Sequence, residues 1–287
     1  MSQASSLQRE AALEAKTAPP QVKAELVDDL NTPESDDDLC WYLAYGSNMT
    51  TKVLTGRRQV KPLEAIPVTC EGYRLAFDCR GLPYFEPAFA SIRPIEPTTN
   101  GTDPVPRTLH GVAFKITKRA YQHIRQTEGG GGHDDIGYLD ITVTCTPYPS
   151  YPSTPIQAHT LLFKSAHPNL HPSLRYLNLL RDGAREFKLD PSYIAYLDNF
   201  PHYQSVSIRQ KVGAGVFVAL FAWVPLTYWT FVIGLGRTFG LKPPRWTVLA
   251  MDAFANLAWK FHDWVLTPIF GAGTKGIETG AVNKKVE

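Results

Sequence analysis

The sequence predicts an α+β protein with a curled or barrel-like sheet. Strand-like runs rich in β-branched and aromatic residues dominate residues 41–164, and only short helix-like segments interrupt them before the chain becomes helical. Hydrophobic residues make up 44% of the 287 positions, which is enough apolar material for a sizeable core. We find no internal repeat, so the pattern favours one strand-rich domain rather than a repeat protein.

The first 39 residues are predicted to form a disordered acidic tail. Residues 1–38 carry nine acidic and three basic side chains, a net charge of −6, against +8 for the remainder. Their few large apolar side chains cannot bury enough surface to offset the entropy lost on ordering. No apolar run follows Met1 and the tail is acidic, so neither a secretory signal nor a mitochondrial presequence is expected. The overall charge of +2, without a cluster of basic and aromatic residues, predicts no nucleic-acid partner.

Residues 40–204 carry the strands and helices of the predicted domain. A short apolar strand at 41–44 runs into the turn Tyr45-Gly46-Ser47-Asn48, and a Thr or Asn cap then starts a helix over 50–57. Six further strands, with proline-rich loops between some of them, are predicted at residues 65–71, 73–79, 88–95, 108–116, 138–146 and 156–164. Three helices, two of them with proline near the first position, are predicted at residues 117–127, 172–188 and 191–199.

The last region, residues 205–287, is predicted to be a hydrophobic and amphipathic helical extension. From Val212 to Gly236, 25 residues contain no Asp, Glu, Lys, Arg or His. A straight helix of this length extends about 37 Å, and the hydrocarbon core of a bilayer is about 30 Å thick. Pro225 lies near the middle and basic residues flank both sides, so a hairpin bent at Pro225 fits at least as well as a span.

The pattern of the second part of the extension, from Trp246 to Phe270, predicts an amphipathic helix. Its apolar face carries Ala250, Phe254, Leu257, Phe261, Trp264 and Val265. Such a stripe suits a membrane interface. The alternative is that both segments are core helices that cover the sheet. The long uncharged run favours membrane association, on the cytoplasmic face.

Two local features of the sequence are candidates for a functional site. The turn at Tyr45-Gly46-Ser47-Asn48 presents backbone N–H groups ahead of a helix, which makes a pocket for a carboxylate or phosphate, and Gly46 allows close approach of the anion. Many such turns bind nothing. Glu128 precedes four glycines, so its carboxylate either faces a cavity or is a solvated loop side chain. The glycine run is not a P-loop, because no Lys-Ser or Lys-Thr follows it.

No metal or disulfide site is predicted. Four cysteines form no C-x-x-C pair and have no histidine at zinc-ligand spacing, namely Cys40, Cys70, Cys79 and Cys145. We therefore expect reduced thiols of a cytosolic protein. The adjacent residues His133, Asp134 and Asp135 rarely converge on one ion, so a solvated loop is expected there.

Four blocks, taken in order, resemble the γ-glutamylcyclotransferases and cover about residues 41–200. The blocks are Tyr42-Leu43-Ala44-Tyr45-Gly46-Ser47-Asn48-Met49, Leu109-His110-Gly111-Val112-Ala113-Phe114-Lys115-Ile116, Gln126-Thr127-Glu128-Gly129 with Gly137-Tyr138, and His171-Pro172-Ser173-Leu174-Arg175-Tyr176-Leu177-Asn178-Leu179-Leu180 with Gly183-Ala184 and Tyr193. The tail after Gln204 lies outside the domain shared with compact members. Such motifs joined to such a tail resemble the fungal branch that includes the gliotoxin-cluster cyclotransferase.

The resemblance implies a mixed β-barrel flanked by helices and a lyase that forms 5-oxoproline. The α-amine of a γ-glutamyl group attacks its own γ-carbonyl, and the attached amine leaves. No metal and no cofactor is implied. Glu128 would be the proton acceptor. Substrate binding would fall to the turn and one helix residue, namely Tyr42, Leu43, Ala44, Tyr45, Gly46, Ser47 and Tyr176.

The implied substrate is a glutathione-derived conjugate in epipolythiodioxopiperazine synthesis. Free glutathione or a γ-glutamyl amino acid is the general alternative. A non-catalytic binding module at a membrane is an alternative of another class, and a lipid-facing structural protein is a third that leaves the ordered blocks unexplained.

Overall fold

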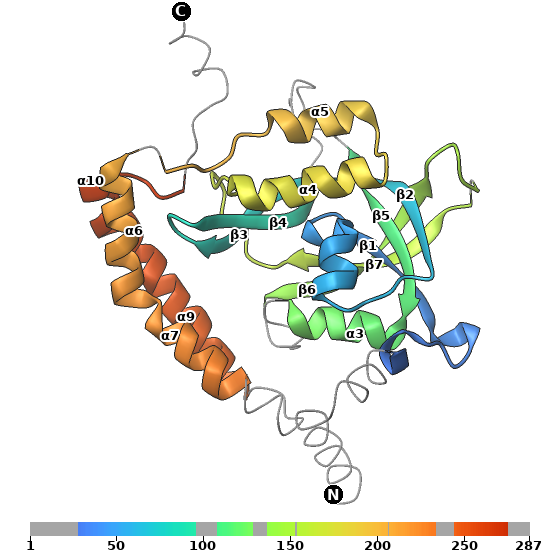
Figure 1. The fold of residues 1–287 in the computed structure, drawn as a ribbon, viewed down its shortest axis with the longest axis horizontal. Coiled ribbons are helices and arrows are strands. Elements are labelled where there is room, and N and C mark those ends of the chain that lie inside the picture. Colours follow the sequence, from blue (N-terminus) through green and yellow to red (C-terminus); the bar gives the residue numbers. More distant parts are fainter. Residues whose placement is uncertain are drawn as a thin grey trace, which may run out of the picture.

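Five strands close into a barrel in the computed structural model, which describes residues 28–95, 108–128, 137–152, 154–205, 207–233 and 244–274. In order around the barrel they are β1 (Leu39–Ala44), β5 (Thr108–Thr117), β2 (Glu64–Glu71), β6 (Tyr138–Pro147) and β7 (Ile156–Phe163). β1 pairs with β7 in parallel and the other four pairs are antiparallel, so the barrel is mixed. The predicted α+β fold with a mixed barrel is confirmed (Figure 1).

The barrel core includes β5, which is buried on both faces. Leu109, Val112, Ala113 and Ile116 have almost no exposed surface. A Cβ on Gly111 would lie 2.6 Å from the carbonyl oxygen of Ala44, so glycine is what allows β5 to run this close to β1. The strand that leads to the predicted turn is therefore held tightly against its neighbour.

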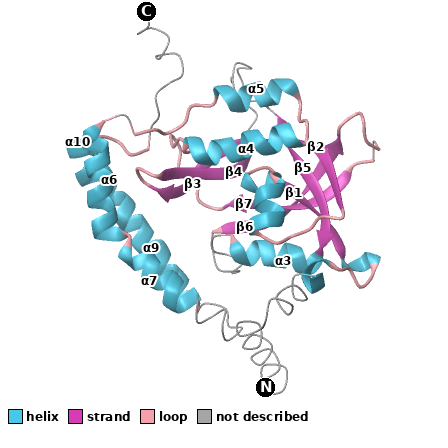
Figure 2. Cartoon of the chain, viewed as in Figure 1, coloured by secondary structure: helices cyan, strands magenta, loops and turns pink. Residues whose placement is uncertain are grey.

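Three helices flank the barrel in the order that the sequence predicts (Figure 2). They are α3 (Lys118–Thr127), α4 (Leu174–Glu186) and α5 (Pro191–Asn199). Each begins at a capping side chain: Thr117, Ser173 and Asp190 accept hydrogen bonds from backbone N–H groups of the first turn. Proline opens α5 at a position where no backbone donor is needed.

A separate two-stranded sheet, β3 (Tyr73–Leu82) with β4 (Glu86–Pro94), stands beside the barrel. Its base is joined to the end of β7. Arg93 donates to the carbonyl oxygen of Phe163 at 2.6 Å and pairs with Asp78 at 2.6 Å, and Ser91 Oγ accepts from the Phe163 N–H at 2.9 Å. A two-stranded ribbon is marginally stable alone, so these contacts and those at its other end determine where β4 lies.

Residues 28–39 correct the predicted tail boundary. Residues 28–31 are helical, and the short helix η1 (Asp36–Asp38) leads directly into β1. Leu30 packs against the barrel core, and its carbonyl oxygen accepts a hydrogen bond from Thr117 Oγ1 at 2.6 Å. This segment is ordered because it buries an apolar side chain, which the acidic composition conceals. Residues 1–27, the rest of the predicted tail, lie outside the described residues.

The C-terminal extension is helical, as predicted, and forms two antiparallel arms (Figure 1). The first arm comprises α6 (Ile208–Phe221), α7 (Trp223–Thr227) and η4 (Tyr228–Ile233). The second arm comprises α9 (Arg245–Phe261), η5 (His262–Leu266) and α10 (Thr267–Phe270). Helical backbone continues through Pro225, because the Leu226 N–H bonds to the Ala222 carbonyl oxygen at 3.2 Å. The hairpin at Pro225, one of the two arrangements left open by the sequence, is therefore wrong.

The extension packs on the tip of the β3–β4 ribbon. Tyr84 in the ribbon turn forms a small second core with Phe217, Ala258 and Leu266. The Tyr84 N–H donates to the Gly273 carbonyl oxygen at 2.8 Å. Other links tie the arm to β3, including a hydrogen bond from Trp259 Nε1 to the Gly81 carbonyl oxygen at 3.1 Å.

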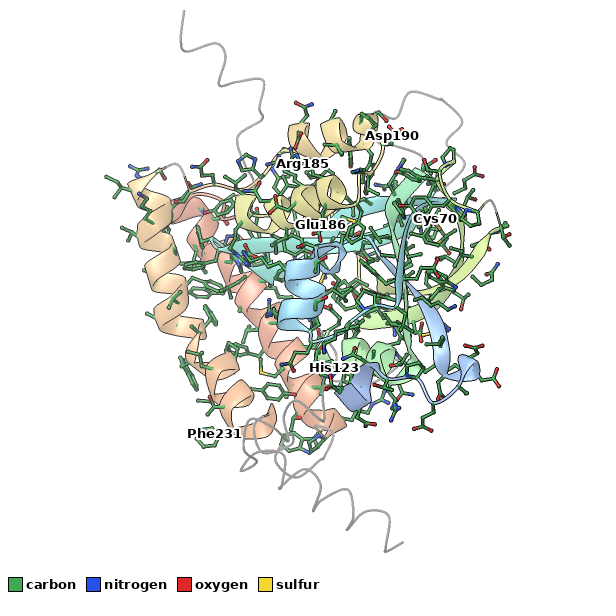
Figure 3. All side chains as sticks on the ribbon, turned by 45° about the vertical axis from the view of Figure 1, so that its right-hand side comes forward. Cys70, His123, Arg185, Glu186, Asp190 and Phe231 are labelled. Carbon is green, nitrogen blue, oxygen red and sulfur yellow. The ribbon has the colours of Figure 1, made fainter. Side chains whose placement is uncertain are left out.

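The predicted membrane span finds no support in the described part of the chain. None of the helices there combines the length and apolar character needed to cross a bilayer. Residues 234–236, the end of the uncharged run, lie outside the described residues. The apolar stripe predicted on the second arm points partly outward, with Leu257 and Trp264 exposed, while Trp259 and Leu266 on another face are buried. Phe231 lies at the end of the arms opposite to α10 (Figure 3).

Candidate active site

The predicted turn lies where β1 leaves the barrel. After Ala44 the chain passes through Tyr45 and Gly46 into the short helix η2 (Ser47–Met49), followed by η3 (Lys52–Arg57) where a helix was predicted. The Tyr45 hydroxyl donates to the carbonyl oxygen of Leu161 on β7. The turn is thus held by the neighbouring strand on one side and by its own short helix on the other.

Gly46 stands where any larger residue would crowd the site. A Cβ there would lie 3.3 Å from the Tyr176 hydroxyl and 3.5 Å from the Ala90 methyl group. Its backbone angles, φ −110° and ψ −145°, lie outside the left-handed region. Glycine is therefore needed for space, so that the main chain faces Tyr176 directly.

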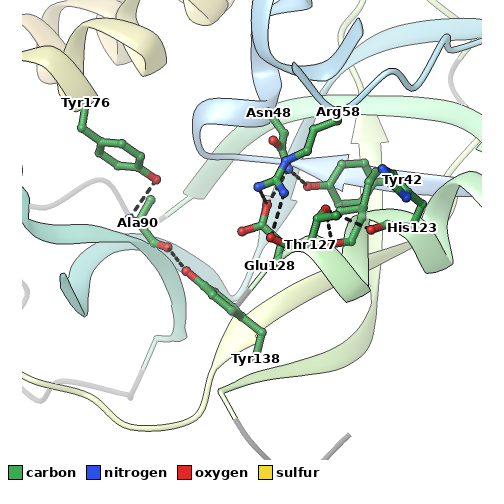
Figure 4. A network of polar contacts seen from close by, with 10 residues as sticks. Tyr42, Asn48, Arg58, Ala90, His123, Thr127, Glu128, Tyr138 and Tyr176 are labelled. Carbon is green, nitrogen blue, oxygen red and sulfur yellow. Dashed lines mark hydrogen bonds and ion pairs between the residues drawn. The ribbon is translucent and has the colours of Figure 1, made fainter. Parts of the chain in front are cut away.

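Glu128 comes to this turn from the end of α3. It is the C-terminal cap of that helix, and its N–H donates to the Ile124 carbonyl oxygen at 2.9 Å. Its carboxylate Oε1 accepts from Asn48 Nδ2 at 3.0 Å and from Arg58 Nη2 at 2.5 Å (Figure 4). The Glu128 side chain is 21% exposed and that of Arg58 is 13% exposed. The carboxylate is thus mostly enclosed and is paired, rather than solvated in a loop.

Tyr176 comes from the first turn of α4. Its hydroxyl accepts from the Ala90 N–H at 3.2 Å and is hydrogen-bonded to the Ser47 side chain. Tyr138, at the start of β6, donates from its hydroxyl to the Ala90 carbonyl oxygen at 3.3 Å (Figure 4). The backbone of one β4 residue therefore links two phenols, one from β6 and one from α4.

These side chains line one small cavity. Its lining residues are Tyr42, Tyr45, Gly46, Ser47, Asn48, Ala90, Glu128, Tyr138, Leu161 and Tyr176. Of the residues that the sequence predicted for substrate binding, Leu43 and Ala44 are buried in the barrel core and do not appear in this lining. Glu128 and the other five predicted residues are brought together. The glycine run after Glu128 lies outside the described residues.

Sequence reasoning did not identify Arg58, Ala90 or Tyr138 as site residues. Tyr138 had a signal, since it lies in the block that resembles the family's glutamate segment. Arg58 had no such signal, because nothing local distinguishes it from the neighbouring Arg57.

A larger hollow of about 390 Å³ lies elsewhere on the barrel, beside Trp41 and Glu64. Its carboxylate, that of Glu64, is exposed, and its lining contains none of the tyrosines that surround Glu128 in the smaller cavity.

The electrostatics of the cavity make its phenols neutral hydrogen-bonding groups. Burial raises the pKa of both Tyr42 and Tyr176, and the Glu128 carboxylate raises each further. Burial also raises the pKa of Tyr45 and of Tyr138 well above the ordinary value. A carboxylate enclosed among neutral hydroxyls can accept and return a proton in a place from which most water is excluded. The fold and site thus define a barrel protein suited to proton transfer on a small polar substrate.

Comparison with known proteins gives the family. No family model matches the chain. It is 33% identical over 264 residues to the γ-glutamyl cyclotransferase aclK of Aspergillus oryzae, covering 86% of this chain and 93% of the relative. It is 31% identical over 243 residues to the γ-glutamyl cyclotransferase gliK of Aspergillus fumigatus, covering 81% and 88%. The chain therefore belongs to the γ-glutamyl cyclotransferase family, and the predicted enzyme class is confirmed.

The matches with fungal relatives also reach into the extension. The γ-glutamyl cyclotransferase gliK of Claviceps purpurea is 29% identical over 232 residues, which cover 78% of this chain and 99% of the relative. These shares are larger than the part of the chain that precedes residue 205, so part of the helical extension is common to these relatives. A solved γ-glutamyl cyclotransferase structure overlaps 62% of this chain and 98% of its own, with TM-score 0.45 and 19% identity. The assignment does not rest on that overlap.

Proposed function

We propose that the enzyme releases 5-oxoproline from a γ-glutamyl amide with Glu128 as the proton carrier. The α-ammonium group of the substrate gives one proton to the Glu128 carboxylate, and the freed amine attacks the γ-carbonyl carbon. A new C–N bond closes the five-membered ring. Glu128 then gives its proton to the amide nitrogen, and the original amide C–N bond breaks. The ring nitrogen still carries two protons, so Glu128 takes one of them and passes it to the departing amine, which leaves as an ammonium ion, and Glu128 returns to its ionised form. The atoms balance without water, and holding the glutamyl chain bent supplies much of the acceleration.

The observation that carries this proposal is that Glu128 and the Tyr45–Ser47 turn line one cavity. Both contacts from Asn48 and Arg58 are made to Oε1. We therefore assign Oε2, the other oxygen of the carboxylate, to the substrate amine. A base must lie within hydrogen-bonding reach of the proton it abstracts, and the enclosed cavity limits where an amine bound there can lie.

The contacts of Asn48 also favour a substrate whose amine lies beside Glu128. Its Nδ2 donates to both the Tyr42 hydroxyl, at 2.9 Å, and Glu128. Its Oδ1 is buried and has no hydrogen-bond partner among the described residues. A buried acceptor without a partner costs about 1–3 kcal/mol, and an ammonium group bound beside Glu128 would satisfy it. We therefore assign Asn48 to binding of the α-ammonium group.

Recognition of the rest of the γ-glutamyl group is assigned to the turn and to Tyr176. Backbone N–H groups at the start of a short helix lack partners within the helix and suit a carboxylate. Gly46 and Ser47 would bind the α-carboxylate in this way, and the Tyr176 hydroxyl would complete the pocket. Leu43 and Ala44 contribute by holding the strand that precedes the turn.

For the group carried on the γ-amide, we propose a glutathione-derived conjugate of a diketopiperazine. Support comes from the likeness to the fungal relatives named above, which extends beyond the catalytic domain. Free glutathione and simple γ-glutamyl amino acids are the alternatives. The reaction centre is the same in all three, because the chemistry takes place on the glutamyl head group.

The decisive experiment measures 5-oxoproline release by mass spectrometry. The substrates are glutathione, γ-glutamyl-alanine and a bis-glutathionyl diketopiperazine. Glu128→Gln keeps the side-chain volume and removes the base, so kcat should fall by at least about 100-fold. Glu71→Gln, on an exposed glutamate at the end of β2, is the matched control and should be active. Release unchanged in Glu128→Gln would refute the assignment of the base, and no release by any folded protein would favour a binding module.

We also propose that the extension lies on an anionic membrane surface without crossing it. Large apolar side chains are exposed along both arms, among them Trp223 at 60%, Trp246 at 72% and Trp264 at 77%. Tryptophan suits the interface because its indole is apolar with one polar N–H group. From residue 207 to 274 the sequence has six Lys or Arg and two Asp or Glu side chains, a charge that complements anionic lipids.

Vesicle sedimentation tests this second proposal. The full chain should pellet with vesicles that contain phosphatidylserine and bind less to pure phosphatidylcholine vesicles. Trp246→Ser combined with Trp264→Ser should weaken the pelleting, and Trp41→Ser on the barrel should not. No pelleting with either vesicle would contradict the proposal, as would loss of the exposed surface in a dimer seen by analytical ultracentrifugation.

A further inference from the structure

Arg58 connects the end of one helix to the carboxylate at the end of another. It caps η3, where its N–H donates to the Val53 carbonyl oxygen at 2.9 Å. Its guanidinium group then reaches the C-terminus of α3, where Nη1 donates to the Thr127 carbonyl oxygen at 2.9 Å and Nη2 donates to Glu128 Oε1 at 2.5 Å (Figure 4). The two contacts fix the guanidinium plane relative to both the helix end and the carboxylate.

Glu128 needs a neighbouring cation because it lies at the C-terminus of α3. The last carbonyl groups of a helix lack intrahelical partners and carry partial negative charge. Glu128 adds a full negative charge at that same end of α3, which is unfavourable for a carboxylate. Arg58 satisfies the Thr127 carbonyl oxygen and neutralises the carboxylate at once. Because Arg58 is mostly buried, this pair is screened less by solvent than a surface ion pair would be.

The other ionisable groups that face Glu128 are neutral at ordinary pH. They are the phenols of Tyr42 on β1, Tyr45 in the turn, Tyr138 on β6 and Tyr176 on α4, with the thiol of Cys79 on β3. Burial raises the pKa of the Cys79 thiol to about 12. Among the described residues around the carboxylate, the charge that offsets it therefore comes from Arg58.

We infer that Arg58 is a positioning residue for the reaction, which places a compensating charge beside Glu128 and binds Oε1 so that Oε2 is left for the substrate amine. The inference rests on the proposed role of Glu128 and adds the group that prepares it. Lysine cannot replace this function fully. An ammonium group supplies the charge, but it lacks the planar fork that contacts Thr127 and Glu128 together.

The test compares Arg58→Met and Arg58→Lys with Arg57→Met, the exposed neighbouring arginine, in the full chain. Steady-state 5-oxoproline release is followed against pH with the substrate that the wild-type enzyme turns over fastest. In Arg58→Met, kcat should fall by about 10- to 100-fold, because a small misplacement of a catalytic group has this effect. The acidic limb of the kcat/KM profile should move to higher pH, since removing a nearby cation disfavours an ionised carboxylate. Arg58→Lys should restore the acidic limb but only part of kcat, and Arg57→Met should match wild type.

A second measurement is independent of turnover. Glutamate side-chain carboxyl carbons are labelled with ¹³C and titrated by NMR, with Glu128→Gln identifying the signal. The midpoint of that signal should move to higher pH in Arg58→Met and remain in place in Arg57→Met. An unchanged midpoint would overturn the inference about Arg58 even if the enzyme is active and requires Glu128. Conversely, the midpoint could shift in Arg58→Met while Glu128→Gln keeps full activity. That result would support the ion pair between Arg58 and Glu128 and refute the proposed function.

Discussion

The hydroxyl of Tyr176 accepts a hydrogen bond from the backbone N–H of Ala90 at 3.2 Å. This contact connects α4, packed on the barrel, to β4 in the separate ribbon. The Ala90 carbonyl oxygen in turn accepts from Tyr138. One wall of the cavity therefore depends on a strand outside the barrel, and the position of that strand depends on what holds the ribbon at both ends.

Tyr176→Phe tests this link. The change leaves the buried Ala90 N–H without its acceptor, which should cost about 1–3 kcal/mol of unfolding free energy, and it removes the partner of Ser47. We expect KM to rise and the urea midpoint to fall. Tyr193→Phe on α5 is the matched control, because the Tyr193 hydroxyl is buried without a partner in the described structure. Its removal should be neutral or stabilising, and equal effects of the two changes would show that the Ala90 contact is unimportant.

Gly183→Ala tests how closely α4 must approach the turn. A Cβ on Gly183 would lie 2.7 Å from the Met49 Cβ and 3.0 Å from the Thr50 backbone nitrogen. Because backbone atoms must move, we expect a loss of about 1–3 kcal/mol in unfolding free energy together with lower kcat/KM. Gly56→Ala has nothing within 4 Å of the new Cβ and should be neutral or slightly stabilising. Full activity and stability in Gly183→Ala would mean that the turn tolerates displacement.

Trp259→Ala tests whether the extension supports the ribbon. Trp259 is buried, bonds to the Gly81 carbonyl oxygen and lies under the Arg80 guanidinium at 4.7 Å. Its loss should increase hydrogen–deuterium exchange in the ribbon turn around Tyr84 by at least about tenfold, since removal of a buried tryptophan costs about 3–5 kcal/mol. Trp264→Ala, which removes an exposed tryptophan from the same arm, should leave this exchange unchanged. Equal exchange in both variants would argue that the ribbon does not need the extension.

We expect His262 to make the contact between the extension and the ribbon sensitive to pH. Its Nδ1 donates to Asp263 at 2.8 Å and its Nε2 accepts from the Gly273 N–H at 3.2 Å. Burial lowers its pKa below the ordinary value of 6.5, opposed by Asp263. The unfolded state therefore binds more protons as the pH falls below 6.5, and stability is lost in that direction.

Exchange at the Tyr84 and Gly273 amides measures this effect. After correction for intrinsic rates, protection should fall by at most about tenfold for each pH unit below the unfolded pKa. His262→Gln should remove the dependence, and His159→Gln on the barrel should retain it. Protection that is constant across this range in the wild-type protein would contradict the role given to His262.

Local pattern predicted the strands and helices of the barrel domain well. Thr117, Ser173 and Asp190 lie at the helix starts because a capping oxygen and the first-turn donors are close in sequence. The strands follow from runs of β-branched and aromatic residues, which need no distant partner to be recognised. The order of the motif blocks then predicted a role for Glu128 and for the Tyr45–Ser47 turn, although neither feature was decisive by itself.

The buried faces of the extension could not be predicted from the local sequence. Its composition indicated apolar helices, but the faces they bury depend on Tyr84, a ribbon residue more than a hundred positions earlier. The same holds within the site. The pairing of Arg58 with Glu128 and of Ala90 with Tyr176 joins residues about 70 or more positions apart.

The sequence by itself therefore determined the family, the order of elements and the carboxylate that carries the proton in our proposal. The tertiary structure decided which arginine accompanies that carboxylate, which backbone group links the two phenols and which face of the extension is buried. The physical reason is that capping and periodicity are set by neighbours within a few residues, whereas ion pairs and packing faces are set by how distant segments meet when the barrel closes.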